Sequence, residues 1–428
     1  MTVDFWRDPV TFIINWLAHV LSGWGLPSGV VTFLMSLIGA GAVATGAMLF
    51  CILLIWYERK MYGRIQDRLG PNRVGPWGIF QPFADMLKIF AKEYITPRGA
   101  EVFTYNLAPI LAVAAVLLIW AVIPFYNNVT GANLNVGALY IIAVGGLGEL
   151  AIILAGLSSN NKYALLGAFR SIALLLSYEV PMVLALLVPV LLARSMGMND
   201  IVQAQGSYWY ILVAPVAAFI FFLTSIAEVG RAPFDIIEAE SEIVAGFNIE
   251  YSGLKFGMFY VGEFLHAFTV SLLFAIVFLG GWRGPFVDQV PVLGVVWLMV
   301  KTMLAYFLVI LLRGSLPRYR TDQMMDLAWK ILTPQALAVV VLTALLDKLF
   351  TGAPELVRGL IFLAMNLVVW MAASRLIQST ARQTRPQEAP LNLDFSIPAK
   401  KAAAPEEAGG NSLPPDPLHM EGAGGTQP

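Results

Sequence analysis

The chain has 428 residues, of which 58% are hydrophobic and 13% charged, and its mean hydropathy is +0.72. This composition excludes a soluble globular protein and indicates an integral membrane protein. The net charge of −1 argues against nucleic acid as a partner. Cys51 is the single cysteine, and the histidines His19, His266 and His419 have no metal-ligand spacing. We therefore expect no metal site, no disulfide and no iron–sulfur cluster held by this chain alone.

The first 29 residues are expected to form an interfacial segment. The stretch from Phe5 to Trp24 mixes three tryptophans with Arg7, Asp8 and His19, a composition typical of a helix that lies on the membrane surface. Residues 379–428 are rich in Pro, Ala, Gly and charge, which predicts a disordered C-terminal tail. We assign this tail no catalytic role.

Between these ends, residues 30–378 are expected to form an all-α polytopic transmembrane domain. Apolar stretches of about 20 residues are long enough to span a bilayer as helices. Nine such stretches occur, at roughly 30–56, 105–124, 136–157, 171–193, 208–230, 257–280, 291–312, 335–350 and 355–377. Lys and Arg are concentrated on one side of these spans, and the segment after the first span alone carries eight of them. This bias predicts an outside N-terminus, a cytoplasmic C-terminus, and cytoplasmic loops at about 57–104, 231–256 and 313–334.

The first cytoplasmic loop contains a predicted amphipathic helix. Phe83, Met86, Leu87 and Phe90 recur at helical spacing within QPFADMLKIFAKE, opposite charged positions. Such a helix is most often a membrane-surface anchor. With Arg59, Arg64 and Arg68 beside it, its apolar face could also admit a lipid-soluble quinone, whose polar end the charged side chains would position.

A dense acidic run, PFDIIEAESEIVAG, follows the fifth expected span. In a helix, Asp235, Glu238 and Glu242 would lie on one face and Glu240 on the other. Neighbouring carboxylates oppose one another's ionisation, so we expect the run to take part in proton chemistry. A solvated acidic loop is the alternative explanation.

Ionisable residues also occur inside the expected spans. They are Glu149, Glu179, Glu228, Glu263 and Lys301. Each costs free energy in a bilayer unless it has a partner or a function. A single buried Glu can simply bind a neighbouring helix, but four on separate spans indicate a polar path. Glycines before Glu149 would allow close helix packing at that point.

Four motifs, in order along the chain, give the sequence a family resemblance. They are ERKMYGRIQDRLGPNRVGPWGIFQPFADMLKIFAKE, NKYALLGAFRSIALLLSYEVPM, AEVGRAPFDIIEAESEIVAGFNIEYSG and LPRYRTDQMMDLAWK with the following TP. From about Val31 to Leu346, the chain resembles the quinone-channel membrane subunit of respiratory complex I, called the H subunit in bacteria and subunit 1 in mitochondria. Its longer N-terminal segment, ninth span and tail depart from the mitochondrial pattern and suit a bacterial, inner-membrane protein.

The resemblance implies a role in proton-translocating NADH:quinone oxidoreductase, with ubiquinone or a related quinone as substrate. Two hydrophilic subunits of the peripheral arm would complete the quinone chamber, and antiporter-like subunits would adjoin this chain in the membrane. FMN and iron–sulfur clusters would be bound by partner subunits, so no catalytic redox site is expected here. By the resemblance, the residues that shape the quinone passage are Arg59, Arg68, Asp85, Lys88 and Arg231. Asp235, Glu238, Glu240 and Glu242 would form the acidic loop beneath it, and Glu228, Glu179 and Glu149 would carry the proton or the signal onward.

Three other interpretations remain open from the sequence. A proton-coupled secondary transporter would also carry acids in its spans, although it often has an inverted repeat, and none is apparent here. The membrane anchor of a related ion-pumping hydrogenase-type complex is a closer alternative. An inert scaffold would be insensitive to neutralisation of the acids.

Overall fold

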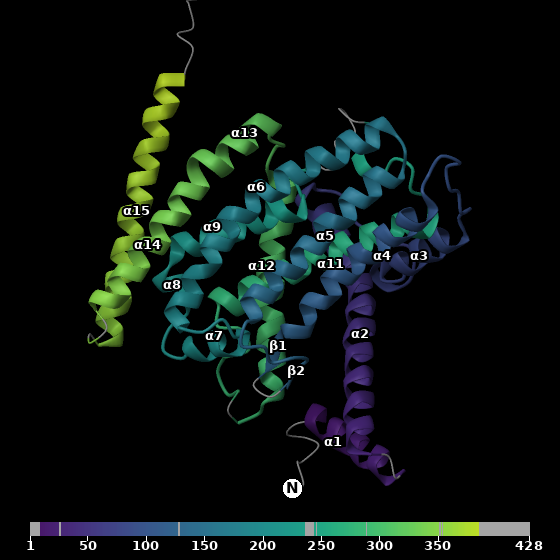
Figure 1. Ribbon diagram of the computed structural model, residues 1–428, viewed down its shortest axis with the longest axis horizontal. Helices are drawn as coiled ribbons and strands as arrows, with labels where there is room; N and C mark the ends of the chain where they lie inside the picture. Colours follow the sequence, from purple (N-terminus) through teal and green to yellow (C-terminus); the bar gives the residue numbers. More distant parts are fainter. Residues whose placement is uncertain are drawn as a thin grey trace, which may run out of the picture. The chain divides into compact units, whose positions relative to one another are not determined.

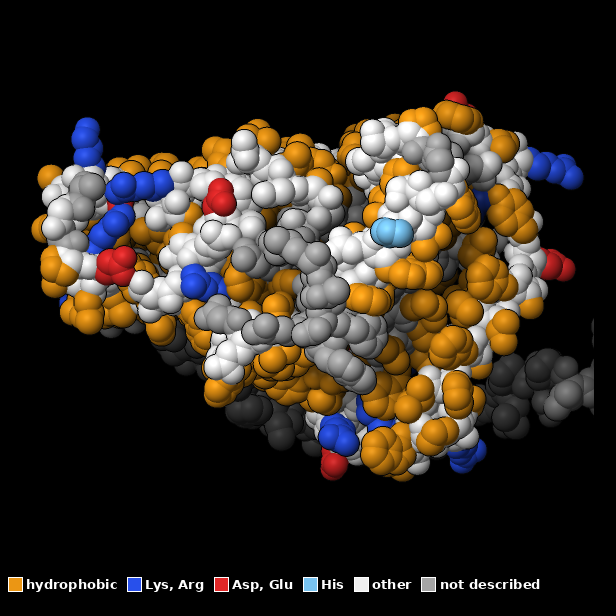
Figure 2. Space-filling view, turned by 90° about the horizontal axis from the view of Figure 1, so that it is seen from below, with side chains coloured by type: hydrophobic (Ala, Val, Ile, Leu, Met, Phe, Trp, Pro, Cys, Tyr) orange, Lys and Arg blue, Asp and Glu red, His pale blue; other side chains and the backbone are white. Residues whose placement is uncertain are grey.

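The computed structural model describes residues 9–24, 27–126, 129–235, 244, 246–287, 289–350, 352 and 354–384. These residues are mainly helical and form only one two-stranded sheet, which confirms the predicted all-α class. The described residues up to Ser379 belong to one compact unit, and a second unit starts at Thr380. Eight of the described helices are long and apolar enough to cross a membrane. Hydrophobic side chains cover most of the face seen in Figure 2, and charged ones occur there only at scattered points.

The N-terminal helices extend further than expected. Helix α1 (Pro9–Gly23) is a short apolar helix, and α2 (Ser28–Ile65) continues nine residues past the end of the predicted first span. With 38 residues, α2 is roughly 57 Å long, which exceeds the roughly 30 Å of a hydrocarbon core. Glu58, Arg59 and Lys60 are therefore helical residues, not the start of a loop. Figure 1 shows one end of α2 beside α1 and the other near α3 and α4.

Helix α11 (Gly253–Phe278) is at the centre of the bundle. It packs against α4 (Val102–Ile119), α9 (Pro215–Val229) and α12 (Val292–Ser315). Helices α5 (Gly137–Ser158) and α6 (Lys162–Ala193) complete the layer, with α4 against α5, α5 against α6 and α6 against α9. Most of α11 is buried, which explains why its sequence is apolar on every face. Figure 1 shows α11 running between α4, α5 and α12.

The short elements on one side of the bundle follow the ends of these helices. Helix η2 (Trp120–Val122) leads into strand β1 (Pro124–Tyr126), which pairs antiparallel with β2 (Val129–Thr130). Helix α7 (Met198–Ala204) follows α6 on the same side. Figure 1 shows β1, β2 and α7 near one another at the lower edge of the bundle.

The fifth predicted span is interrupted, which corrects the expectation of a continuous helix over 208–230. Helix α8 (Tyr210–Val213) ends at Ala214, which has φ −127° and ψ 60°, and α9 begins at Pro215. Proline has no N–H to donate and disfavours helical geometry in the preceding residue, so the break occurs here. Helix α9 has 15 residues and is too short to count among the eight spans. It ends at Gly230 (φ 71°), which places Glu228 and Arg231 inside the bundle instead of at its surface.

The C-terminal helices begin earlier than predicted. Helix α13 (Thr321–Asp326), the π-helical turn η4 (Leu327–Leu332) and α14 (Thr333–Leu349) form one apolar run of 29 residues, so the expected loop at 313–334 is reduced to a short link. The Ala328 carbonyl accepts from the Thr333 backbone N–H, five residues further along the chain, and also from the Thr333 hydroxyl at 2.8 Å, and this spacing is that of a π turn. Helix α15 (Glu355–Thr384) contains the predicted ninth span.

The segment after α2 follows a tight path. Helices η1 (Pro76–Gly78) and α3 (Gln81–Ala91) lie there, and α3 confirms the predicted amphipathic helix, with Phe83, Met86, Leu87 and Phe90 all exposed. Gly78 has φ +77°, and a Cβ atom at this position would be 2.3 Å from the Pro71 carbonyl oxygen. The glycine is thus required both by its conformation and by the close backbone approach. A final short helix, η3 (Gly246–Asn248), precedes α11.

Candidate functional site

A buried ion network joins α2, the segment after α9, α11 and α12. The Arg231 Nη1 atom is 2.8 Å from Glu58 Oε2, and its Nε atom is 3.3 Å from Glu263 Oε1. Arg313 Nη1 is 2.5 Å from Glu58 Oε1, and the Tyr306 hydroxyl donates to Glu58 Oε2 at 2.8 Å. The Glu58 and Arg231 side chains are at most 2% exposed. Glu58 thus receives three donors in a site from which water is nearly excluded.

The network balances its charges. Two arginines face two glutamates, and the Arg231 guanidinium also lies 4.9 Å from the centre of the Phe264 ring. Such a set persists in a low-dielectric interior because each charge has an opposite charge close by, and Glu58 is hydrogen-bonded as well. Removal of one member would leave the others under-compensated. The network can therefore respond strongly to a change of charge close by.

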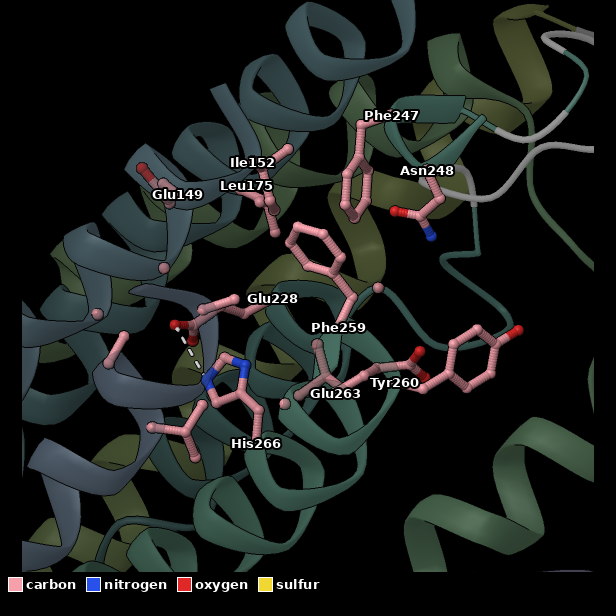
Figure 3. A pocket seen from close by; sticks show the side chains of 18 of the residues that line it. Glu149, Ile152, Leu175, Glu228, Phe247, Asn248, Phe259, Tyr260, Glu263 and His266 are labelled. Atoms are coloured by element: carbon pink, nitrogen blue, oxygen red, sulfur yellow. Dashed lines mark ion pairs between the residues drawn. The ribbon is translucent and has the colours of Figure 1, made fainter. Parts of the chain in front are cut away.

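A cavity of about 130 Å³ begins at this network. Its charged or titratable lining residues are Asp235, Glu263, Arg313, His266, Glu228, Glu149 and Tyr260. Its other walls are mainly apolar side chains of α4 and α11 and residues around η3, including Phe247 and Phe259 (Figure 3). A cavity of this size and polarity has room for several water molecules.

A second, smaller cavity of about 40 Å³ continues the polar row. It shares Glu149, Glu228 and His266 with the first cavity and adds Glu179. The His266 Nε2 atom is 3.8 Å from Glu228 Oε1, drawn as a dashed line in Figure 3. The carboxylates of α5, α6, α9 and α11 thus follow one another through the bundle. This arrangement could hold and pass protons between neighbouring acids.

Glycines on α5 make room for the row. A Cβ atom at Gly145 would be 3.8 Å from Glu228 Oε1, and Gly145 and Gly148 both line the first cavity. The 3.8 Å separation is an ordinary contact distance, so the expectation that glycines before Glu149 permit close helix packing stays a prediction. A larger side chain at Gly145 would enter the space beside the Glu228 carboxylate.

The residues predicted for the quinone passage fall into two places. Asp85 on α3 forms an ion pair with Arg59 at the end of α2, and its other oxygen is 3.8 Å from Lys88 Nζ. Arg68 lies nearby in sequence, but its Nε donates to Gln66 at 2.7 Å and it is exposed. Arg231, in contrast, is buried in the ion network with Glu58. The structure thus brings Arg59, Asp85 and Lys88 together and places Arg231 deeper in the protein.

The acidic run is only partly within the described residues. Asp235 lines the first cavity, beside the buried ion network. Glu238, Glu240 and Glu242 lie outside the described residues, as does most of the predicted acidic loop. The expected C-terminal tail also lies outside them, from residue 385 onward.

Lys301 is a buried charge that does not join the carboxylate row. Its Nζ atom donates to the carbonyls of Leu279 at 2.7 Å, Gly281 at 3.0 Å and Arg283 at 2.7 Å. These carbonyls follow the C-terminus of α11, where a cation is favourable. The lysine therefore caps α11 and anchors the loop that follows it.

The site residues that the sequence prediction did not assign are Glu58, Glu263, His266, Tyr306 and Arg313, of which Glu263 was noted only as an ionisable residue in a span. A signal for Glu58 was present, because Ala47, Cys51, Leu54 and Glu58 recur at spacings of four, three and four, and all are buried on one side of α2. The adjacent Arg59 and Lys60 made Glu58 look like a residue at a solvated helix end. No comparable local pattern distinguishes Arg313 from the other basic residues near the end of α12.

Comparison with known proteins identifies the family of this chain. The sequence profile of the family described as NADH dehydrogenase matches residues 38–344. The H subunit of NADH-quinone oxidoreductase from Vesicomyosocius okutanii subsp. Calyptogena okutanii is 42% identical over 358 residues, covering 81% of this chain and 98% of that relative. The H subunit from Dehalococcoides mccartyi (strain CBDB1) is 47% identical over 293 residues, covering 68% of this chain and 81% of that relative. The H subunit from Geobacillus sp. (strain WCH70) is 44% identical over 311 residues, covering 71% of this chain and 93% of that relative.

Fold and site together define an all-α integral membrane protein whose interior carries a row of carboxylates beside a buried ion network. The chain belongs to the NADH dehydrogenase family, together with these H subunits of NADH-quinone oxidoreductase. This confirms the resemblance drawn from the sequence motifs. Helix α15 follows residue 344, where the family match ends.

Proposed function

We propose that this chain is a membrane subunit of a proton-translocating NADH:quinone oxidoreductase in the bacterial plasma membrane. It would form the quinone access chamber with hydrophilic partner subunits and would couple quinone reduction to proton movement through its buried carboxylates. The observation that carries this proposal is the row from the Glu58–Arg231 network through Glu228 and Glu149 to Glu179. Family membership and the names of the relatives support the oxidoreductase part.

In the proposed reaction, quinone accepts two electrons and two protons and becomes quinol. The electrons would come from FMN and iron–sulfur clusters on partner subunits, so this chain would supply positioning and proton chemistry only. Among the residues that the structure describes, no group of three or more His, Cys, Asp or Glu side chains is placed to hold a metal ion. Electron arrival at the quinone would place negative charge near the chamber before the protons follow.

The entrance of the quinone would lie at α3 and the adjoining end of α2. The exposed apolar face of α3 suits an isoprenoid substrate, and Arg59, Asp85 and Lys88 supply hydrogen-bonding groups beside it. Basic residues are concentrated in this segment, which favours a cytoplasmic location. The N-terminus would then be outside and the C-terminus inside.

The coupling step would be electrostatic. Two charges attract or repel more strongly in a low-dielectric interior than in water, so negative charge at the quinone changes the field at the nearby ion network. Asp235, Glu263 and Arg313 link that network to the first cavity. A proton could then pass by way of His266 and Glu228 to Glu149 and on to Glu179, with water in the two cavities as the intermediate carrier.

The test is Glu228→Gln in the assembled complex, measured in native membranes. Quinone reductase activity and proton pumping should both fall at least roughly tenfold, because the amide cannot release and accept a proton. The matched control is Glu101→Gln, which makes the same change at an exposed residue outside both cavities. Immunoblotting of the intact complex separates lost function from failed assembly. Unchanged reduction and pumping in an assembled Glu228→Gln complex would refute the proposed role of the row.

A further inference from the structure

A groove lies along the seam between α15 and the rest of the bundle, and none of its lining residues belongs to the carboxylate row. Its walls include Phe219 and Leu223 of α9, Gln335 of α14, and Trp370 and Ala373 of α15, and its volume is about 270 Å³. A second hollow of about 280 Å³ shares Phe219 and Trp370 and extends to Leu367 and Pro215. Figure 1 shows α15 beside α14 at the edge of the bundle.

The length of this groove along α15 suits part of a lipid acyl chain. The two hollows together extend on α15 from Asn366 to Ser374, and these eight residue steps correspond to roughly 12 Å along the helix axis. One leaflet contributes roughly half of the 30 Å hydrocarbon core. The outer surface of α15 next to the groove is apolar and exposed at Val368 and Met371, as expected for a helix that faces lipid.

The groove also contains a buried polar atom without a partner. Gln335 is 8% exposed, and its Nε2 atom has no hydrogen-bond partner among the described residues. A buried amide donor without an acceptor is unfavourable. An occupant of the groove that brings an acceptor oxygen to Gln335 would remove this cost. A pure hydrocarbon has no acceptor oxygen and would leave this cost in place.

Two exposed arginines are next in sequence to residues that line the groove. Tyr319 and Ser374 line it, and the residues next to them in sequence include Arg318 and Arg375, both exposed. Basic residues beside a membrane-facing site attract anionic headgroups. The groove therefore combines an apolar channel with a buried donor, and arginines are adjacent in sequence to two of its lining residues.

We propose that this groove binds one acyl chain of an anionic phospholipid. The Gln335 Nε2 atom would donate to the ester carbonyl of that chain, and Arg318 and Arg375 would face the phosphate. The lipid would fill the seam between α9 and α15 that direct contacts close only in part. Phe219 of α9 forms an edge-to-face pair with Trp370 of α15, and close to this seam the Asn366 Nδ2 atom donates to the carbonyl of Val213 in α8 at 3.2 Å. This inference does not depend on the proposed proton path.

The experiment uses the intact complex in nanodiscs that contain phosphatidylglycerol with a photoactivatable group on the acyl chain. Crosslinked peptides are identified by mass spectrometry. Labelling of the α9, α14 and α15 peptides should fall several-fold in Ala373→Trp, which fills the groove. The matched control is Ala372→Trp, because Ala372 is the neighbouring residue and does not line the groove. Gln335→Leu should also reduce labelling, and Arg318→Gln should reduce the preference for phosphatidylglycerol over phosphatidylcholine about fivefold.

Three results would overturn the proposal. Labelling that is equal in Ala373→Trp and Ala372→Trp would mean that the groove is not occupied by lipid. Labelling that excess quinone removes would assign the groove to an isoprenoid tail. A crosslink from α15 to another subunit, with no lipid adduct on the groove peptides, would mean that a protein partner covers it.

Discussion

Arg231 and Glu58 form an ion pair of 2.8 Å across 173 positions of sequence, and both side chains are almost fully buried. The pair connects the end of α2, which leads to the α3 segment, with the turn after α9, which leads to Asp235. A shift in position or charge at either segment can therefore act on the other through this ion pair. Arg313, Tyr306 and Glu263 extend this pair into the wall of the first cavity.

We predict that Arg231→Gln destabilises the protein by about 3–5 kcal/mol, because it leaves the carboxylates of the buried network under-compensated. Tyr306→Phe should cost about 1.5–3 kcal/mol, since it removes one hydrogen bond to a charged group. The measurement is the thermal unfolding of the purified complex. Arg64→Gln, at an exposed position on α2, is the control and should be nearly neutral. Equal stability of Arg231→Gln and Arg64→Gln would contradict the prediction.

The carboxylates should act in series. Glu149→Gln and Glu228→Gln should each reduce proton pumping strongly, and the double variant should be no slower than the slower single variant. Residues that serve one pathway are not additive, because either substitution already interrupts it. Pumping is measured by dye quenching in inverted membrane vesicles, normalised to assembled complex. A double variant that multiplies the two single effects would indicate parallel routes.

Gly145 should tolerate only small side chains. Gly145→Ala places a Cβ atom at an ordinary 3.8 Å from Glu228 Oε1, whereas Gly145→Leu would fill the cavity beside this carboxylate. We expect near-normal pumping in the alanine variant and a severe loss in the leucine variant. Gly146→Leu is the control, because a Cβ atom at Gly146 meets no heavy atom within 4 Å. Similar pumping in the two leucine variants would exclude a specific steric role for Gly145.

Asp85→Asn should weaken the use of quinone without unfolding the protein. The partly exposed ion pair with Arg59 contributes at most about 1 kcal/mol to stability, but Asp85 fixes the position of Arg59 beside α3. We expect a raised KM for quinone and little change in kcat. Lys88→Gln should have a smaller effect, since Lys88 is 74% exposed and 3.8 Å from the carboxylate. Steady-state kinetics with a short-chain quinone would distinguish these effects, and an unchanged KM in Asp85→Asn would argue against a quinone entrance at this place.

Lys301→Met tests whether the buried charge of Lys301 stabilises the fold or takes part in proton coupling. It removes three hydrogen bonds to carbonyls that follow α11, so stability should fall by a few kcal/mol. The ratio of protons pumped to quinone reduced should stay unchanged, because Lys301 lines neither cavity of the carboxylate row. Thermal unfolding and the pumping ratio, measured on the same preparation, test both parts. A lowered ratio would place Lys301 in the coupling path.

The sequence by itself determined the all-α membrane class, the approximate places of most spans, the amphipathic α3 and the family. It also identified Glu149, Glu179 and Glu228 as charges with a cost inside the membrane. These are local properties, since hydropathy, helical periodicity and short motifs are contained within a few turns of chain. Even the break before Pro215 and the burial of Glu58 have local signals.

Only the tertiary structure decided which of these charges meet. It joined Glu58 to Arg231 and Arg313, placed Glu263 in the same network, and separated Lys301 from the acids although all of them lie in apolar helices. The energy of a buried charge depends on the groups that packing brings within a few ångströms, and these come from helices far apart in sequence. Hydropathy therefore marks a buried charge as costly, whereas helix packing decides what compensates it.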